Sequence, residues 1–290
     1  MDIYMHLKSR FSATELFKIA KALHDNYQPF LLDCQVWELI KTIVPGDAYH
    51  ELLQPLSNHI VGHRVVNDIV MNNYFGERKV KYHLSLKFMG REDEVSAFEF
   101  NVGSSRLDFA RINGHSYAYE IKTELDSLDK LEKQITDYSK VFEYVHVVCH
   151  PEHFKKVKES VPEYCGIITY NTGKPDFPFS FKQKRSKNPE LNLQVQLSTL
   201  TTKELEKIIR DEGWKSTLPM ERIDREELIL SKLTEEKINH LFKESIKRRF
   251  YKRWTYICEN LDKIQPIDLQ PFFKSNADPY WVYYKNSSMV

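Results

Sequence analysis

Asp108, Glu120 and Lys122 have the residue types and the spacing of a metal-dependent active site. Two carboxylates held close together repel each other unless a cation lies between them. Mg²⁺ suits such a pair because it takes oxygen ligands and retains several waters, one of which can attack a phosphate. Lys122, two residues after Glu120, can stabilise the developing negative charge or orient that water. This set predicts hydrolysis of phosphodiester bonds.

The segment around these residues reads as a β-hairpin. Residues 106–112 and 115–123 are rich in aromatic and branched side chains at period two, which is typical of strands. The dipeptide Asn113-Gly114 between them is a strong hairpin turn signal. Asp108 then lies in the first strand, and both Glu120 and Lys122 lie in the second.

The length of the hairpin loop decides which side chains share a face. A two-residue turn would pair Asp108 with Tyr119 and place Glu120 on the opposite face. A three-residue loop over 113–115 would set Asp108 directly opposite Glu120, which favours a shared metal site. With that loop, one face carries Asp108, Ala110, Ala118, Glu120 and Lys122, and the other carries Leu107, Phe109, Tyr117, Tyr119 and Ile121.

Helices are predicted before the hairpin. Residues 1–75 read as helical, with a capping box at Ser12 and Glu15 and a helix over 59–75. A further helix is predicted to begin near Glu77. Residues 98–102 then form the first expected strand.

The chain after the hairpin alternates between helix and strand. Residues 127–144 carry an apolar stripe at helical spacing. Residues 145–149 and 166–170 are short, nearly continuous apolar segments with a helical segment between them, a pattern typical of buried strands. The expected fold is therefore α/β, with a mixed sheet and helices packed on it.

The same residues resemble a known family. Asp108, followed after eleven residues by Glu120-Ile121-Lys122, resembles the motif of the PD-(D/E)XK nuclease superfamily. Gln134 and Tyr138, in the sequence QITDY, resemble the QxxxY motif of its RecB-type branch. Residues 99–148 as a whole are similar to a group of bacterial and phage proteins in this superfamily.

The resemblance implies a restriction-endonuclease-like fold, with helical extensions at both ends, and assigns roles to its residues. Asp108 and Glu120 would be the metal ligands, for Mg²⁺ or Mn²⁺, and Lys122 would be the catalytic lysine. The family often adds a further glutamate; Glu77 fits that position slightly better than its rival Glu99. Gln134 and Tyr138 would share one helical face and point toward the site or the DNA.

Composition limits the class of protein. The chain has 290 residues, 41% of them hydrophobic and 29% charged, and a net charge of +1, so nucleic-acid binding would depend on local basic patches. The four cysteines form no CxxC pair, which favours a reduced compartment. The N-terminus lacks an apolar signal region, and no stretch is long enough to span a membrane. We expect a soluble, cytoplasmic protein with no membrane partner.

The predicted domain organisation has four parts: residues 1–70 as a helical region, 71–182 as the nuclease core, 183–197 as an exposed linker, and 198–290 as a helical C-terminal region. Within the last part, residues 200–233 resemble the helix–loop–helix SAP module, a small DNA-binding element. Two packed helices of no special role are the alternative.

Residues 243–256 mix basic and aromatic side chains, a combination that can neutralise phosphates and stack on bases. The segment contains Lys243, Lys247, Arg248, Arg249, Phe250, Tyr251, Lys252, Arg253 and Trp254. A solvated amphipathic helix is the alternative reading.

Three histidines raise the question of a zinc site, but they lack cysteine partners, so packing or surface roles are favoured. They are His146, His150 and His153.

The predicted function is metal-dependent cleavage of nucleic acid, DNA rather than RNA. The rival is a protein of the same fold that binds nucleic acid or regulates without cleaving. A protein partner and a homo-oligomer both remain open.

Overall fold

The computed structural model describes residues 3–174, 176–214 and 221–284, and its contacts divide the chain into two compact units. The helical unit comprises Met1–Leu84 and Thr255–Val290, and the sheet unit comprises Ser85–Trp254. Helices α6 (Glu77–Leu86) and α12 (Glu235–Glu259) cross the two boundaries. The sheet unit begins after residue 71, where the expected core starts, and extends past residue 182, where the expected core ends.

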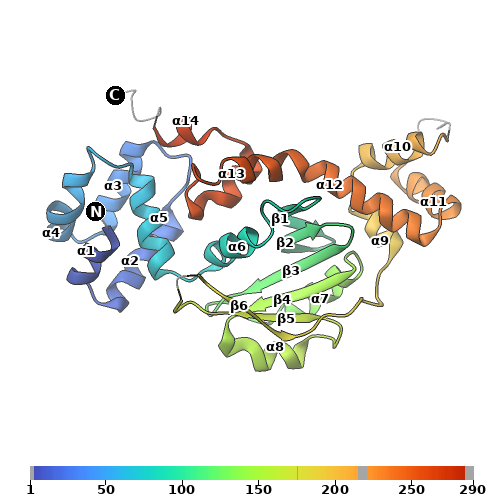
Figure 1. The fold of residues 1–290 in the computed structure, drawn as a ribbon, viewed down its shortest axis with the longest axis horizontal. Coiled ribbons are helices and arrows are strands. Elements are labelled where there is room, and N and C mark those ends of the chain that lie inside the picture. Colours follow the sequence, from blue (N-terminus) through green and yellow to red (C-terminus); the bar gives the residue numbers. More distant parts are fainter. Residues whose placement is uncertain (1–2, 175, 215–220, 285–290) are drawn as a thin grey trace. The chain divides into compact units, whose positions relative to one another are not determined.

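The sheet unit is an α/β structure built on one mixed six-stranded sheet in the order β1-β2-β3-β4-β5-β6 (Figure 1). Strands β1 to β3 form an antiparallel meander, β3, β4 and β5 are parallel, and β6 returns antiparallel to β5. The bounds are β1 (Val95–Val102), β2 (Ser105–Ile112), β3 (Ser116–Lys122), β4 (Tyr144–Cys149), β5 (Gly166–Tyr170) and β6 (Phe179–Gln183). The predicted hairpin and the two apolar strands are confirmed.

Helices connect the parallel strands, as a parallel pair requires. Helix α7 (Leu131–Ser139) contacts β2, β3 and β4, while η3 (Pro151–His153) and α8 (Phe154–Ser160) lead to β5. The predicted helix over 127–144 is shorter at both ends. It stops early because Asn188 donates its side-chain amide to the carbonyls of Ser139 and Phe142, and the chain turns into β4.

The segment predicted as an exposed linker, residues 183–197, is partly structural. Gln183 is the last residue of β6, and helix α9 begins at Leu193. Between them Asn188 is only 3% exposed, because its side-chain amide donates to the Ser139 carbonyl at the end of α7. The charged composition of residues 183–197 gave no sign of this buried side chain or of Gln196, which is 0% exposed and donates to the Val141 carbonyl.

Four helices follow within the sheet unit: α9 (Leu193–Ser198), α10 (Thr202–Asp211), α11 (Arg222–Lys232) and α12. Helices α10 and α11 pack on each other, while residues 215–220 of the SAP-like segment lie outside the described residues. Helix α12 packs on the sheet, since Phe250 contacts Phe100 and Trp254 contacts Phe109. This packing extends the unit well beyond residue 182.

The helical unit has its own apolar core, formed mainly by α2, α3 and α5. The capping box at Ser12 and Glu15 is confirmed, with the Ser12 backbone N–H donating to the Glu15 carboxylate. Its elements are α1 (Ile3–Arg10), α2 (Ala13–Asn26), α3 (Asp33–Ile43), α4 (Gly46–Ala48), η1 (Tyr49–Leu53), η2 (Gln54–Leu56), α5 (Gly62–Asn73), η4 (Pro266–Asp268), α13 (Leu269–Ser275) and α14 (Pro279–Tyr283). Among the described residues of the whole chain, no helix is long and apolar enough to cross a membrane.

Candidate active site

The β2–β3 hairpin has a three-residue loop. Ile112 pairs with Ser116 and Phe109 pairs with Tyr119, so Asp108 and Glu120 are the next positions in this register. The backbone N–H of Asn113 donates to the His115 carbonyl at 3.0 Å across the loop. Between them Gly114 has φ 91°, a left-handed conformation that suits glycine. The two-residue turn is wrong, and the register that favours a shared site is confirmed.

The β1–β2 ladder is interrupted where β2 reaches Asp108. Phe98 pairs with Phe109 and Phe100 pairs with Leu107, so Glu99 and Asp108 fall at a break in the strand register. Glu99 has φ 57°, an uncommon conformation for a non-glycine residue in a strand. Backbone strain of this kind often marks functional sites.

Both carboxylates at this irregularity are held by specific contacts. Glu99 forms an ion pair with Arg106 at 2.5 Å, and Asp108 accepts a hydrogen bond from the backbone N–H of Ile121 at 2.7 Å. Carboxylate oxygens of Glu99 and Asp108 lie within 4.8 Å of each other. The site thus contains two acidic groups at one break in the ladder.

Glu120 and Lys122 form a buried ion pair on the same face of β3. The Nζ of Lys122 lies 2.9 Å from the Oε1 of Glu120, and their side chains are 10% and 2% exposed respectively. A single charge at this depth would be unstable, so each group depends on the other. The pair is a fixed feature of the site rather than a surface contact.

Helix α7 supplies one further partner to each member of this pair. Gln134 accepts a hydrogen bond from the Lys122 ammonium at 2.9 Å, and the Tyr138 hydroxyl donates to the Oε2 of Glu120 at 2.9 Å. Burial raises the pKa of Tyr138, and the charge of Glu120 raises it further, so the hydroxyl stays protonated. Residues four apart share one helical face, as predicted, and here each fixes a different side chain of β3.

The opposite face of the hairpin is apolar, as predicted. Phe109 contacts Phe88 and Trp254, and Tyr119 stacks on His146 with ring centroids 4.6 Å apart. Burial lowers the pKa of His146 to about 3, so this imidazole is neutral. His146 is a packing residue on the face away from the carboxylates.

The two other histidines lie near the end of β4. The Nε2 of His153 is 2.9 Å from the Thr123 carbonyl, and His150 contacts the ring of Tyr170. Both contacts fit structural roles, in agreement with the packing interpretation.

The sheet unit alone therefore brings together six of the predicted residues: Glu99, Asp108, Glu120, Lys122, Gln134 and Tyr138. Glu77 belongs to the helical unit, where it is the first residue of α6 and pairs with Lys81 one turn later. The role of Arg106 beside Glu99 was missed. Its position two residues before Asp108, on the same strand, was the available signal.

The donor set of this site fits a hard divalent cation. Its potential ligands are carboxylate oxygens, and Mg²⁺ binds oxygen at about 2.0–2.1 Å, so two ligands of one ion lie about 3–4 Å apart. The separation of up to 4.8 Å between Glu99 and Asp108 is close to that range. The Oε1 of Glu120 faces Lys122 and its Oε2 accepts from Tyr138, so both oxygens of this carboxylate lie at the site.

Comparison with known proteins places the chain in a family. Residues 71–272 match the family model described as "Bacteriophage P4 protein cII". The chain belongs to the bacteriophage P4 protein cII family. The match includes every residue of the candidate site and all of helix α12.

A curated relative in this family is protein cII of Enterobacteria phage P4, which is 32% identical over 148 residues. The aligned segment covers 51% of this chain and 56% of that relative, so the chain spans about half the length of the cII protein it matches. A solved structure, the SPO1766 protein of unknown function from Silicibacter pomeroyi, is 13% identical and covers 49% of this chain and 92% of its own. Its TM-score of 0.30 is too low to assign the fold.

Proposed function

We propose that this chain is a metal-dependent nuclease that hydrolyses phosphodiester bonds of DNA. The observation that carries the proposal is the buried arrangement of Glu120 and Lys122, with Gln134 holding the lysine and Tyr138 holding the glutamate. A purely structural ion pair needs no such pair of dedicated partners. The restriction-endonuclease-like form of the sheet belongs to the same proposal.

Each side chain has a distinct task in this mechanism. Asp108 and Glu120 would hold Mg²⁺ or Mn²⁺, with Glu99 or Glu77 as a further ligand. When bound, the ion supplies a water of lowered pKa and a positive charge beside the phosphate. The Lys122 ammonium stabilises negative charge on the attacked phosphate, and it is kept in place by Gln134 and Glu120.

Tyr138 acts as a positioning residue. Its hydroxyl donates to Glu120 and remains protonated, so it orients the carboxylate without taking part in proton transfer. Partners of this kind fix the direction of metal ligands, and their loss commonly lowers metal affinity or activity by about 10- to 100-fold.

A binding protein that keeps this fold but does not cleave is the second candidate. The ion pair of Lys122 with Glu120, taken without its α7 partners, also fits this candidate, because a lysine can balance a buried carboxylate in place of a metal ion. The strained backbone at Glu99 and its approach to Asp108 favour the nuclease, since charge balance requires neither.

The proposal is tested by incubating the full chain with linear and circular DNA, in single- and double-stranded form, and with RNA. We expect cleavage of DNA with Mg²⁺ or Mn²⁺ and none with EDTA. Ca²⁺ should permit binding with little turnover because it activates water poorly. Binding without cleavage under every metal condition would favour the second candidate, and full cleavage in EDTA would end the metal mechanism.

A further inference from the structure

Helix α12 carries two kinds of basic residue, and the structure separates them. Lys243, Lys247 and Arg249 turn toward the sheet unit, where each has an acidic partner. Arg248, Lys252 and Arg253 are exposed, and within the described parts of the chain none of the three contacts a carboxylate. Of the six basic residues in this segment, three therefore form ion pairs within the sheet unit and three face solvent in the described structure.

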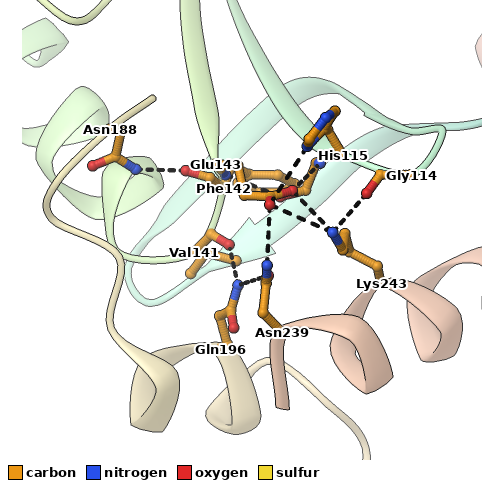
Figure 2. Close-up of polar contacts among 10 residues, drawn as sticks. Gly114, His115, Val141, Phe142, Glu143, Asn188, Gln196, Asn239 and Lys243 are labelled. Atoms are coloured by element: carbon orange, nitrogen blue, oxygen red, sulfur yellow. Dashed lines mark hydrogen bonds and ion pairs between the residues drawn. The ribbon is translucent and has the colours of Figure 1, made fainter. Parts of the chain in front are cut away.

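The structural half anchors α12 to the β2–β3 hairpin (Figure 2). Lys243 donates to the Gly114 carbonyl at 2.6 Å and lies 3.3 Å from the Glu143 carboxylate. Asn239, one turn earlier, donates to Glu143 at 3.1 Å, and Glu143 accepts from the backbone N–H of Ser116 at 2.8 Å. Helix and hairpin are thus joined through one buried carboxylate.

Further along the helix the anchoring continues through Arg249. Its guanidinium pairs with Glu204 and lies over the ring of Phe100. Phe250 and Trp254 pack against the sheet. The exposed side of α12 therefore belongs to the same body as the candidate active site.

The exposed face changes character along the helix. Its first half carries the exposed acids Glu235, Glu236 and Glu244 together with Lys237. Residues 248–253 carry the exposed side chains Arg248, Tyr251, Lys252 and Arg253, which we name the α12 basic face, and the exposed acid Glu259 follows at the end of the helix. Arg248 and Lys252 are one turn apart, with about 6 Å of helical rise between them. Tyr251 beside them is 59% exposed.

We propose that the α12 basic face binds single-stranded DNA. Three unpaired cations complement the charge of a phosphate backbone, and an exposed tyrosine among them offers a ring on which an unpaired base can stack. A duplex would present phosphates but no free base face, so Tyr251 selects the single strand. This binding goes beyond the proposed cleavage because it requires none of the catalytic residues.

The test is equilibrium binding of a fluorescent single-stranded oligonucleotide to the full chain, measured in EDTA over a range of salt concentrations. The variant carries Arg248→Gln, Lys252→Gln and Arg253→Gln. The matched control carries Lys155→Gln, Lys156→Gln and Lys158→Gln on α8, where the three lysines are equally exposed. Both variants lose three positive charges from the same unit, so they differ only in where the charge is lost.

We expect the α12 variant to bind about tenfold more weakly, with the slope of log affinity against log salt reduced by about 2, or roughly 0.7 for each lost contact. The α8 control should keep the wild-type slope. Tyr251→Ser should weaken single-strand binding about tenfold with an unchanged slope, and should leave duplex binding unaltered.

Equal behaviour of the α12 and α8 variants would overturn the proposal, as would a wild-type chain that does not bind the strand. So would an α12 variant that keeps DNA binding but loses binding to vesicles of anionic phospholipid. Because the assay is run without metal, a chain that binds through α12 but never cleaves would refute the nuclease and leave this proposal intact.

Discussion

The two compact units each bury a carboxylate that accepts a hydrogen bond from tyrosine, yet they treat its charge differently. In the sheet unit, Glu120 receives the Tyr138 hydroxyl and is paired with the ammonium of Lys122. In the helical unit, Asp268 receives the hydroxyls of Tyr27 and Tyr283, both at 2.8 Å. Burial raises the pKa of Asp268 to about 7, so about half of these carboxyl groups hold a proton at neutral pH.

The difference between Asp268 and Glu120 shows how the contacts of a buried carboxylate indicate its role. Asp268 is fully buried, and its neighbour Tyr27 also contacts His63, whose pKa burial lowers to about 4. That network links elements of the helical unit and offers no path to a substrate. Glu120 instead lies beside the ammonium of Lys122, and Asp108 on the neighbouring strand β2 is partly exposed. A buried carboxylate paired with a lysine beside an accessible acid indicates chemistry, whereas a buried carboxylate held by two tyrosines indicates a structural role.

The largest expected effect separates the roles of Glu120 and Lys122. Glu120→Gln and Lys122→Ala should each lower the cleavage rate by roughly 10²-fold or more, the scale of losing one electrostatic contributor. Glu120→Gln should also weaken Mn²⁺ binding, because an amide is a poorer ligand for a hard cation. Lys122→Ala should retain it. Calorimetric titration with Mn²⁺ measures the difference, and equal loss of metal affinity in both variants would contradict these roles.

A smaller effect is expected from the α7 partners. Tyr138→Phe keeps the ring in its packing but removes the donor to Glu120, so it should lower activity about tenfold and weaken metal binding. Gln134→Ala should lower turnover by a similar factor without changing metal affinity, because Gln134 contacts Lys122. If both variants keep the wild-type cleavage rate and metal affinity, the contacts from α7 do not contribute to the site.

A comparison of Glu99→Gln with Glu77→Gln identifies which glutamate is the third ligand of the proposed metal ion. Whichever glutamate completes the site should lower Mn²⁺ affinity several-fold to tenfold when neutralised, and the other should leave it unchanged. Arg106→Gln serves as a control for Glu99, since it removes the ion-pair partner and keeps the carboxylate. If neither glutamate changes metal affinity, Asp108 and Glu120 act without a third carboxylate.

In the helical unit the expected effect is on stability and not on cleavage. The raised pKa of Asp268 makes the folded state hold a proton that the unfolded state releases, so its contribution is present below about pH 4 and lost as pH rises to about 7. His63 acts in the opposite sense: its lowered pKa favours the fold increasingly as pH rises from about 4 to about 6.5. In the wild-type protein these trends oppose each other over most of the same range.

Single substitutions should expose each trend. In Asp268→Asn the free energy of unfolding should rise with pH between about 4 and 6.5, and in His63→Gln it should fall between about 4 and 7. At 1.36 kcal/mol for each unit of pKa shift, the rise in Asp268→Asn should be about 3 kcal/mol and the fall in His63→Gln about 4 kcal/mol. Urea denaturation at several pH values measures both, with the cleavage rate as the control. Loss of cleavage by the folded form of either variant would contradict the claim that Asp268 and His63 affect only stability.

The chemistry-bearing hairpin could be predicted because local signals determine it. Period-two patterning located β2 and β3, and the benefit of placing Asp108 opposite Glu120 selected the three-residue loop. The spacing of Gln134 and Tyr138 likewise placed them on one face of α7. What they contact, however, depends on how α7 crosses β3, which no local pattern records.

The errors lay where long-range contacts decide the structure. Asn188 sits in a charged stretch that resembles a linker, and it is buried only because α7 ends beside it. The mixed basic and aromatic segment 243–256 did not show which of its cations are paired, and in the structure Lys243 pairs with Glu143 and Arg249 pairs with Glu204. The left-handed backbone at Glu99 has no sequence signature, because glycine or asparagine would be expected there.

The central claim is tested most directly by the rate of cleavage of a labelled linear DNA in Mg²⁺, under single-turnover conditions, by the full chain and by Asp108→Asn. Both proteins should bind the DNA in Ca²⁺, so that any difference in rate reports chemistry. The account predicts cleavage by the wild-type chain and a rate at least roughly 10²-fold lower for the variant. Equal rates for the two proteins, or no cleavage by the wild-type chain despite DNA binding, would contradict it.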